Sequence, residues 1–421
     1  MDAIRSFLQR TLPRNLYRSL LLPYHFIWTV AAVVYYRFPA RHLTVIGVTG
    51  TKGKSSVSEM MHAVLTLHGH KTVLSSTIHF VIGTEARANR FKMTLPGRGF
   101  IQKLLREAVT AGCTHAVIEV TSESALQYRH LFLDLDALIF TGLEKEHLES
   151  HGGMENYLQA KLRIGTALVH SPKRPRTIVA TADNAYGERF LSLPVENQIS
   201  FSVTDVQNLT LTPTMVSFTY SGVSFTVPHP GEFSLRNALS VTKLAEVLGV
   251  PVATSASALG SLETIQGRVE RVEAGQAFLA VVDYAHTPDS LEALYRAYEG
   301  KRKICVLGNT GGGRDTWKRP AMGALADSYC DEVILTDEDP YDEEPYRIVN
   351  EMAKGMKRTP HIIMERRDAI AQALAMAREG DAVLITGKGT DPYIMRARGE
   401  KEVWSDSRVV REELEKLLTM T

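Results

Sequence analysis

Residues 47–56 read GVTGTKGKSS and follow the apolar run Leu43–Val48, which predicts a buried strand. Glycines let backbone N–H groups turn toward phosphate oxygens, and a helix beginning there adds its dipole. Lys54 is expected to reach the β- and γ-phosphates of a nucleotide, and Ser55 to ligate Mg²⁺. The spacing departs from the common phosphate loop, which has glycine where Val48 stands, so a tight strand–helix turn without a ligand is the alternative.

Strand and helix patterns alternate after this loop, which is typical of a doubly wound parallel sheet. A helix is expected from about Ser55 to His68. Further strands are expected at Thr72–Ser75, Ala116–Val120, Ala137–Phe140 and Thr177–Ala180. From Gln198 to Val227 the apolar period changes to two, which predicts two or three antiparallel strands appended to the sheet. Gly231–Gly249 is again helical in pattern.

A second alternating set follows Gly267-Arg268-Val269-Glu270, which is interpreted as a domain junction. Its strands are expected at Ala277–Val282, Lys303–Leu307, Glu332–Thr336, His361–Met364 and Ala382–Thr386. The chain is therefore divided into a central domain, residues 41–268, and a smaller α/β domain, residues 269–421.

The composition describes an ordinary soluble globular chain. Its 421 residues are 44% hydrophobic and 23% charged, with a formal net charge of +1. A net charge this small gives no strong electrostatic attraction to nucleic acid or anionic lipid, so no nucleic-acid partner is expected. Cys113, Cys305 and Cys330 show neither metal spacing nor a disulfide framework, which favours a reducing cytoplasm.

Residues 1–40 are expected to form an apolar N-terminal helical segment. Leu20–Tyr36 is nearly all apolar, and Arg14, Arg18, Arg37 and Arg41 bracket it. One interpretation is a helix packed against the next domain. The other is a helix seated in a membrane, either spanning it or lying in its plane, and possible association is therefore assigned to residues 20–36.

Five motifs resemble those of the Mur ligases, the amide synthases that build peptidoglycan. Gly50–Ser55 is similar to their GTxGKS loop, which folate polyglutamate synthases share. The other four resemble the Mur ligase type that adds the third peptide residue. They are EVTSESAL at Glu119–Leu126, EHLESHGGMENYLQAK at 146–161, DYAHTPD at Asp283–Asp289, and GGGRD at Gly311–Asp315 with Lys318-Arg319-Pro320 and Gly387-Lys388-Gly389.

The resemblance covers residues 43–421 and implies an α/β fold with a central P-loop ATPase domain and a C-terminal Rossmann-like domain. It implies an ATP-dependent peptide ligase that phosphorylates a carboxylate and lets an amine displace phosphate. The expected acceptor is a muramoyl dipeptide, the expected amino acid is lysine or diaminopimelate, and the expected cofactors are ATP and Mg²⁺. The protein is expected to be a monomer in the cytoplasm; a position at the inner face of the cell membrane is the alternative.

The resemblance also implies roles for single residues. Catalytic roles fall to Lys54, His147, Lys161 and Arg268; the expected Mg²⁺ ligands are Ser55, Glu119, His147 and Lys161 as a CO₂-derived carbamate. The expected ATP-binding residues are Gly50, Thr51, Lys52, Gly53, Lys54, Ser55, Ser56, Arg268, Asp283 and His286. The expected acceptor-binding residues are Thr94, Pro96, Ser122, Gln127 and Arg129. The amino-acid residues are Arg314, Asp339, Gly387 and Asp391.

The sequence departs from the family pattern at the amino-acid site. Diaminopimelate-adding enzymes read DNPR, whereas this chain reads EDPY at Glu338–Tyr341. The arginine that would bind the second carboxylate of diaminopimelate is therefore absent. The surrounding residues are strongly acidic, which favours a basic amino acid such as lysine, although other residues could supply the cation for diaminopimelate. Glu123 replaces a family histidine and Gly142 a family asparagine.

The resemblance does not extend to residues 1–40, where the family has a domain that binds uridine diphosphate. The acceptor is therefore expected to be held mainly by its peptide, or to be presented near a membrane. Three other functions stay open: a polyglutamate- or folate-directed ligase, a non-catalytic ATP-binding protein, and a plain P-loop hydrolase.

Overall fold

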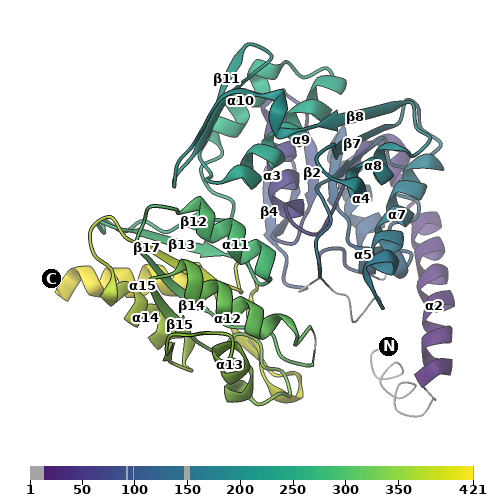
Figure 1. Ribbon diagram of the computed structural model, residues 1–421. Coiled ribbons are helices and arrows are strands. Elements are labelled where there is room, and N and C mark those ends of the chain that lie inside the picture. Colours follow the sequence, from purple (N-terminus) through teal and green to yellow (C-terminus); the bar gives the residue numbers. More distant parts are fainter. Residues whose placement is uncertain (1–13, 92, 98, 147–151, 314, 421) are drawn as a thin grey trace.

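The computed structural model describes residues 14–91, 93–97, 99–146, 152–313 and 315–420. Its largest sheet has eight strands in the order β4-β3-β2-β5-β1-β6-β7-β8 (Figure 1). These strands are β1 Thr44–Thr49, β2 Thr72–Ser75, β3 His79–Ile82, β4 Glu85–Ala88, β5 His115–Glu119, β6 Ala137–Phe140, β7 Thr177–Thr181 and β8 Asn197–Phe201. All pairs are parallel except those that β3 makes with β2 and β4. The expected parallel sheet is thus confirmed.

Helices cover both faces of this sheet because its central strands are buried on both sides. One face packs against α3 (Lys54–Leu67), α9 (Glu232–Val247) and α10 (Val252–Ser261). The other packs against α4 (Phe100–Thr110), α7 (Met154–Val169) and α8 (Ala185–Leu191). The short helix α5 (Ser122–Leu126) begins just after β5, with Thr121 as its N-cap.

The predicted strands between Gln198 and Val227 divide between two sheets, which corrects the sequence interpretation. β8 is a parallel edge strand of the large sheet, paired with β7. An edge strand is half-buried and therefore alternates like an antiparallel one. The separate antiparallel sheet contains β9 (Gln207–Leu211), β10 (Val216–Tyr220) and β11 (Val223–Val227). The sequence interpretation also missed the β3–β4 hairpin and α10.

The C-terminal part of the chain forms a six-stranded sheet in the order β12-β13-β17-β14-β15-β16. Its strands are β12 Glu270–Arg271, β13 Leu279–Asp283, β14 Lys303–Leu307, β15 Glu332–Leu335, β16 His361–Ile362 and β17 Ala382–Thr386. One face packs against α11 (Pro288–Ala297), α12 (Lys318–Tyr329) and α13 (Pro345–Ala353). The other packs against α14 (Arg366–Met376) and α15 (Asp406–Met420). A two-stranded ribbon, β18 (Tyr393–Met395) and β19 (Lys401–Val403), follows β17.

Cys305 and Cys330 are joined by a disulfide, which contradicts the expectation of unpaired cysteines. Cys305 lies in β14 and Cys330 directly follows α12, so the strand–helix unit brings together residues that are 25 positions apart. The linear spacing held no sign of this contact. Cys113 is a free, buried thiol.

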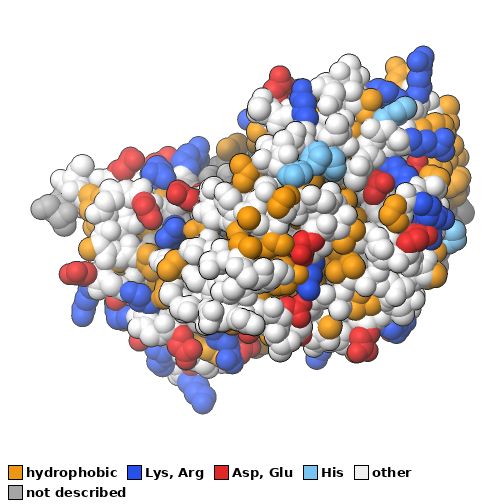
Figure 2. Space-filling view, turned by 90° about the horizontal axis from the view of Figure 1, so that it is seen from above, with side chains coloured by type: hydrophobic (Ala, Val, Ile, Leu, Met, Phe, Trp, Pro, Cys, Tyr) orange, Lys and Arg blue, Asp and Glu red, His pale blue; other side chains and the backbone are white. Residues whose placement is uncertain are grey.

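The N-terminal helix α2 (Arg14–Tyr35) lies at the outer edge of the molecule, beside α4 (Figure 1). Among the described residues, no helix is both long and apolar enough to cross a membrane. Seen from above, charged side chains of both signs are scattered over the surface, as the net charge of +1 leads one to expect (Figure 2).

We expect the free energy of unfolding to fall as the pH is lowered from about 6.5 to about 4. Burial lowers the pKa of His130 and of His229 to about 4. Between the two pKa values the unfolded chain binds more protons than the folded one, so each histidine contributes a slope of at most about 1.4 kcal/mol per pH unit. Urea unfolding at several pH values measures this slope. His229→Gln, whose amide can still donate to Leu262 O, should make it shallower; an unchanged slope contradicts the assignment.

Candidate active site between the two large sheets

The phosphate loop connects β1 to the first turn of α3, as expected. Gly50 has φ 154°, and a Cβ there would lie 2.0 Å from Thr141 Oγ1; Gly53 has φ 79°, and a Cβ would lie 2.6 Å from Asn237 Oδ1. Only glycine fits such close approaches. The loop therefore keeps its backbone open at the N-terminus of α3, where N–H groups without helical partners favour an anion.

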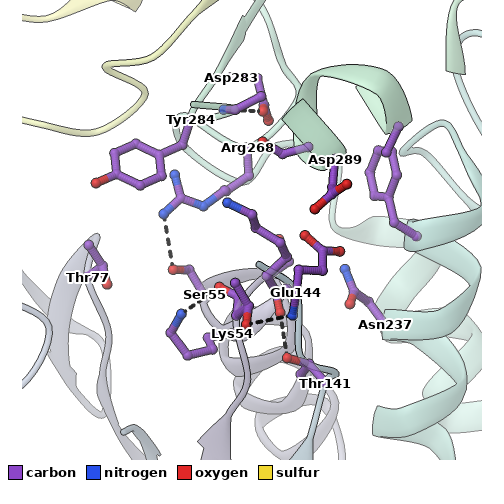
Figure 3. Close-up of a pocket in the computed structure, with 18 of the residues that line it drawn as sticks. Lys54, Ser55, Thr77, Thr141, Glu144, Asn237, Arg268, Asp283, Tyr284 and Asp289 are labelled. Carbon is purple, nitrogen blue, oxygen red and sulfur yellow. Dashed lines mark hydrogen bonds between the residues drawn. The ribbon is translucent and has the colours of Figure 1, made fainter. Parts of the chain in front are cut away.

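The loop opens into a cavity of about 370 Å³ between the large sheet and the six-stranded sheet (Figure 3). Lys54 and Ser55 face it from the loop, and Arg268 and Tyr284 face it from the opposite side. The other predicted nucleotide residues that line it are Thr51, Lys52, Gly53, Ser56, Asp283 and His286. Burial lowers the pKa of Lys54, whose Nζ donates to Thr51 O at 3.0 Å.

Glu119, at the end of β5, is buried and lies beside Ser55. Its Oε2 accepts hydrogen bonds from Ser55 Oγ (3.1 Å), from Thr77 N (2.8 Å) and from Thr77 Oγ1 (3.0 Å). Thr77 Oγ1 is in turn 2.8 Å from Thr94 Oγ1, and Arg268 Nη2 donates to Ser55 Oγ at 3.2 Å. One hydrogen-bonded chain thus runs from Arg268 to Thr94 through the end of β5.

Lys161, on α7, is 1% exposed, which is exceptional for a lysine. Its Nζ donates to Gly50 O at 2.6 Å and lies 4.7 Å from the centre of the Tyr157 ring. Burial, with Lys54 nearby, lowers the pKa of Lys161 well below the usual value. Burial therefore favours the neutral form of this amine, which lies against the phosphate loop at Gly50.

Arg268 joins the two halves of the site. Its guanidinium carbon lies 4.5 Å from the centre of the Tyr284 ring. This contact orients the guanidinium nitrogens toward Ser55. Asp283 accepts from Val269 N (2.8 Å) and Ala285 N (2.7 Å), so it braces the connection that carries Arg268. Gly267, with φ 61°, approaches so closely that a Cβ would lie 2.5 Å from Gly389 C.

A second bridge crosses the cavity through Glu146. Lys52 Nζ is 3.4 Å from Glu146 Oε2, and His286 Nε2 is 2.7 Å from Glu146 Oε1. Lys52 belongs to the phosphate loop, whereas His286 follows β13 in the C-terminal sheet. Lys52 and His286, two nucleotide residues predicted from distant motifs, are thus bridged by one carboxylate.

The geometry agrees with the comparisons with known proteins. Residues 48–245 match the Mur ligase middle domain, and residues 267–389 match the Mur ligase glutamate ligase domain. The chain is 34% identical over 397 residues to a UDP-N-acetylmuramoyl-L-alanyl-D-glutamate–2,6-diaminopimelate ligase of Caldanaerobacter subterraneus subsp. tengcongensis; the match covers 90% of this chain and 80% of the relative.

The chain belongs to the Mur ligase family. It is also 36% identical to a UDP-N-acetylmuramyl-tripeptide synthetase of Roseiflexus sp., over 86% of this chain and 77% of the relative. A solved UDP-N-acetylmuramoyl-L-alanyl-D-glutamate–2,6-diaminopimelate ligase has a TM-score of 0.61 and 27% identity, and the match covers 89% of this chain and 79% of that one. Mur ligases are ATP-dependent and form an amide bond, and relatives of this chain are named for steps of peptidoglycan precursor synthesis.

The predicted acceptor residues of this Mur ligase lie beside the end of the cavity that Ser55 and Glu119 line. Thr94 and Ser122 line the cavity itself. Arg129 Nη1 donates to Leu95 O at 2.7 Å, and Arg129 Nη2 contacts Gln127 Oε1. Pro96 is buried in the same loop as Thr94. The loop before α4 and the turn after α5 therefore form one wall.

Three of the four predicted amino-acid residues, Asp339, Gly387 and Asp391, lie close to Lys388, whose side chain is fully buried. Lys388 Nζ donates to Asp339 Oδ1 at 2.8 Å and lies 3.4 Å from Asp391 Oδ2. Glu338 packs against Gly387, where a Cβ would lie 2.3 Å from Glu338 Oε2. Burial raises the pKa of Glu338, and its Oε2 has no hydrogen-bond partner. Two carboxyl groups thus contact Lys388, and a third, that of Glu338, lies close to Gly387 beside it.

Two predicted residues, His147 and Arg314, lie outside the described residues. Among the residues that the structure does describe, no group of three His, Cys, Asp or Glu side chains could hold a metal ion. Ser55 Oγ and the Glu119 carboxylate nevertheless offer hard oxygen donors 3.1 Å apart, and oxygen donors are what Mg²⁺ takes when phosphates complete its shell. The residues present therefore fit Mg²⁺ bound together with a nucleotide.

The sequence interpretation missed Thr77, Phe233, Asn237 and Glu144, which all line the cavity. Phe233 and Asn237 lie in the first two turns of α9, and Asn237 Oδ1 lies close to Gly53 of the phosphate loop. The helical pattern that begins at Gly231 was the available signal. Thr77 follows β2 and carried no motif. Glu144 Oε2 is buried without a partner, and burial raises the pKa of this carboxyl group.

Proposed function

We propose that this Mur ligase joins a diamino acid to the terminal carboxylate of a muramoyl dipeptide through an acyl phosphate. The observation that carries the proposal is the hydrogen-bonded chain from Arg268 through Ser55, Glu119 and Thr77 to Thr94. It connects the residues expected around the γ-phosphate with those expected around the acceptor. A carboxylate placed at Thr94 would therefore lie near the phosphorus that it must attack.

The first step transfers the γ-phosphoryl group. An acceptor carboxylate oxygen attacks the γ-phosphorus, the bond to the β-phosphate oxygen breaks, and ADP leaves. Lys54 and Arg268 neutralise the charge on the transferred group, and Arg268 can do so with two parallel donors. Ser55, Glu119 and His147 would hold Mg²⁺, which would offset the negative charge of the phosphates.

The second step forms the amide. The neutral amine of the incoming amino acid attacks the acyl carbon, the bond to the phosphate oxygen breaks, and the nitrogen then loses a proton. Because water would hydrolyse the acyl phosphate, the site must exclude it. We assign residues 41–268 to binding ATP and the acceptor, and residues 269–421 to binding the amino acid and delivering it.

Lys161 is proposed to react with CO₂ and form a carbamate. A neutral amine is the reactive form, and burial of Lys161 favours that form. Nitrogen attacks the carbon of CO₂, one proton leaves, and an anionic carboxyl group results. Lys54 and Lys52, which both lower the pKa of Lys161, would stabilise this anion. The carbamate would serve as a further oxygen ligand for Mg²⁺.

The acceptor is proposed to bind along Thr94, Pro96, Ser122, Gln127 and Arg129. Arg129 holds the wall together through Leu95 O and Gln127. A guanidinium at this position suits a second carboxylate of the peptide. We propose that the enzyme acts as a monomer in the cytoplasm and that α2 lies against the inner face of the cell membrane.

Acceptor-dependent release of phosphate tests the proposed reaction. The full chain is incubated with ATP, Mg²⁺, UDP-muramoyl-dipeptide and a mixture of amino acids, and the product is identified by mass. A tripeptide product with ADP and phosphate supports the proposal. Phosphate release without an acceptor indicates a plain hydrolase, a product only with a folate or polyglutamate acceptor indicates another ligase, and nucleotide binding without release indicates a non-catalytic protein.

We expect lysine to be used in preference to diaminopimelate. Asp339 and Asp391 lie with Glu338 around Lys388, and this concentration of carboxyl groups supports a second ammonium group on the amino acid. Arg396, a cation near Tyr341, is already paired with Asp337 and Glu402. A panel of amino acids at equal concentration measures the preference as kcat/KM.

Asp391→Asn should reduce the lysine preference about tenfold, because one charged partner of the ammonium is lost. Glu400→Gln, which removes an exposed charge from the loop between β18 and β19, is the matched control and should leave it unchanged. Turnover with diaminopimelate but none with lysine refutes the assignment.

A further inference from the structure

One end of the active-site cavity has no role in the two chemical steps. Thr77 and Thr94 line the end that lies beside the expected γ-phosphate and the acceptor. A nucleotide whose γ-phosphate lies there must extend its nucleoside toward the opposite end. In Figure 3, Glu144, Asn237 and Asp289 lie on the side of the cavity away from Thr77. These three side chains are therefore expected near the nucleoside.

The walls of this far end suit a flat aromatic base. Phe233 lies one helical turn before Asn237 on α9, and both line the cavity. Ala293 lies one turn after Asp289 on α11, followed by Leu294, and all three line the cavity from the C-terminal domain. Apolar side chains contact the faces of a purine, whereas hydrogen-bonding groups reach only its edge. The base is therefore expected between α9 and α11.

Glu144 brings an unsatisfied carboxyl group to this end of the cavity. Its Oε2 is buried and has no hydrogen-bond partner among the described residues. Its backbone N donates to Thr51 Oγ1 at 3.0 Å, which ties the residue to the phosphate loop. Burial raises the pKa of the carboxyl group, and Asp289 contributes to the rise. A buried oxygen without a partner costs free energy, which a donor on a bound ligand would recover.

The lysines near Glu144 do not supply that donor. Lys54 Nζ donates to Thr51 O at 3.0 Å, and Lys52 Nζ lies 3.4 Å from Glu146 Oε2. Lys54 is also expected to contact the β- and γ-phosphates once a nucleotide is bound. The Glu144 carboxyl group is therefore left for a donor on the nucleoside itself.

We propose that Glu144 selects adenine by accepting a hydrogen bond from the 6-amino group of the base. A carboxyl group offers an acceptor oxygen whether it is ionised or protonated. A purine without the amino group would leave Oε2 buried and unpaired, and one with a carbonyl oxygen at position 6 would set acceptor against acceptor. The inference rests on where the proposed function places the γ-phosphate. It adds to that function the residue that decides which nucleotide is used.

Nucleotide binding tests the proposal without any need for turnover. Calorimetry in the presence of Mg²⁺ measures the Kd of ADP, of purine riboside diphosphate, which lacks the 6-amino group, and of 2′-deoxy-ADP. The proteins are the unaltered full chain, Glu144→Leu, Glu144→Gln and Asp289→Asn. Glu379→Leu is the matched control, because Glu379 is exposed in the turn before β17, away from the cavity.

We expect the unaltered chain and Glu379→Leu to bind ADP at least about tenfold more tightly than purine riboside diphosphate, since one hydrogen bond to a buried carboxyl group is lost with the amino group. In Glu144→Leu the two Kd values should become nearly equal. Glu144→Gln keeps an acceptor oxygen and should retain part of the difference. The ratio of the Kd values of ADP and 2′-deoxy-ADP should be the same in all five proteins.

Each ratio compares two ligands on one protein, so a general loss of stability does not imitate the expected result. An unchanged ratio of ADP to purine riboside diphosphate in Glu144→Leu overturns the inference, as does a ratio that only Asp289→Asn abolishes. A change in Glu144→Leu that follows the 2′-hydroxyl instead assigns Glu144 to the ribose. Failure of the unaltered chain to bind ADP overturns it too. Discrimination between the nucleotides without formation of a tripeptide, by contrast, refutes only the proposed ligase function.

Discussion

Lys161→Ala is expected to lower kcat at least about 100-fold, which is the usual cost of removing one preorganised electrostatic group from an active site. The substitution removes the amine that would become a carbamate, and with it a proposed oxygen ligand for Mg²⁺. It also opens space beneath the phosphate loop, next to Gly50 O, where the lysine nitrogen now lies. Steady-state release of phosphate with both substrates saturating measures the loss.

Small carboxylates provide the sharpest control for Lys161. Acetate or formate should restore part of the activity of Lys161→Ala, because an anion can enter the space that the side chain leaves. Lys161→Met fills that space with an apolar chain of similar length, and no rescue is expected. Thermal unfolding of both variants shows whether the fold is kept. Wild-type activity in the methionine variant, or equal rescue of both variants, would refute the carbamate.

Labelled carbon dioxide gives a readout that does not depend on turnover. After incubation with ¹³C-bicarbonate, one carbamate carbon signal should appear in the NMR spectrum of the unaltered chain. It should be absent from both Lys161 variants. Because the amine must be neutral to react, the signal should weaken as the pH is lowered.

Glu119→Gln is expected to raise the Mg²⁺ concentration required for half-maximal activity at least about tenfold and to lower kcat about 100-fold. A glutamine oxygen can still accept from Ser55 and Thr77, so the hydrogen-bonded chain and the fold are kept. What is lost is the negative charge next to the metal. A Mg²⁺ titration at saturating ATP measures the shift.

Thr77 provides the matched pair for Glu119. Thr77→Ser keeps the hydroxyl that donates to Glu119 and should behave like the unaltered chain. Thr77→Val removes that donor but keeps the negative charge of the carboxylate, so it should change the Mg²⁺ requirement less than Glu119→Gln does. An unchanged Mg²⁺ requirement in Glu119→Gln would exclude Glu119 as a ligand.

The local sequence pattern was sufficient to predict most strands of the two large sheets. Four strands, at Thr72–Ser75, Ala137–Phe140, Lys303–Leu307 and Ala382–Thr386, begin and end where their apolar runs do. Buried parallel strands are continuous apolar runs bounded by turns, so their limits are local information. β8 was misread and the β3–β4 hairpin was missed. Half-buried strands near the edge of a sheet alternate between apolar and polar residues whether their partner strand is parallel or antiparallel.

The candidate site, too, could be predicted in part from local sequence and in part only from the fold. Glycines, lysine and serine at the end of a strand identify a phosphate loop, because backbone conformation and helix dipole act within a few residues. The arginine, aspartate and histidine of the C-terminal motifs were identified by resemblance. That Arg268 touches Ser55, and that His286 touches Glu146, depends on how two sheets face one another across the cavity.

Several properties are visible only in the folded chain. The low pKa of Lys161 arises from burial beneath a loop that is 111 positions away in sequence. The Cys305–Cys330 disulfide and the contact of α2 with the acceptor wall also join segments that no local pattern relates. Residue types and spacing specified the phosphate loop and the alternating strands because these depend on neighbours along the chain. Burial and the coupling between charges depend on neighbours in space, and only the tertiary structure brings those together.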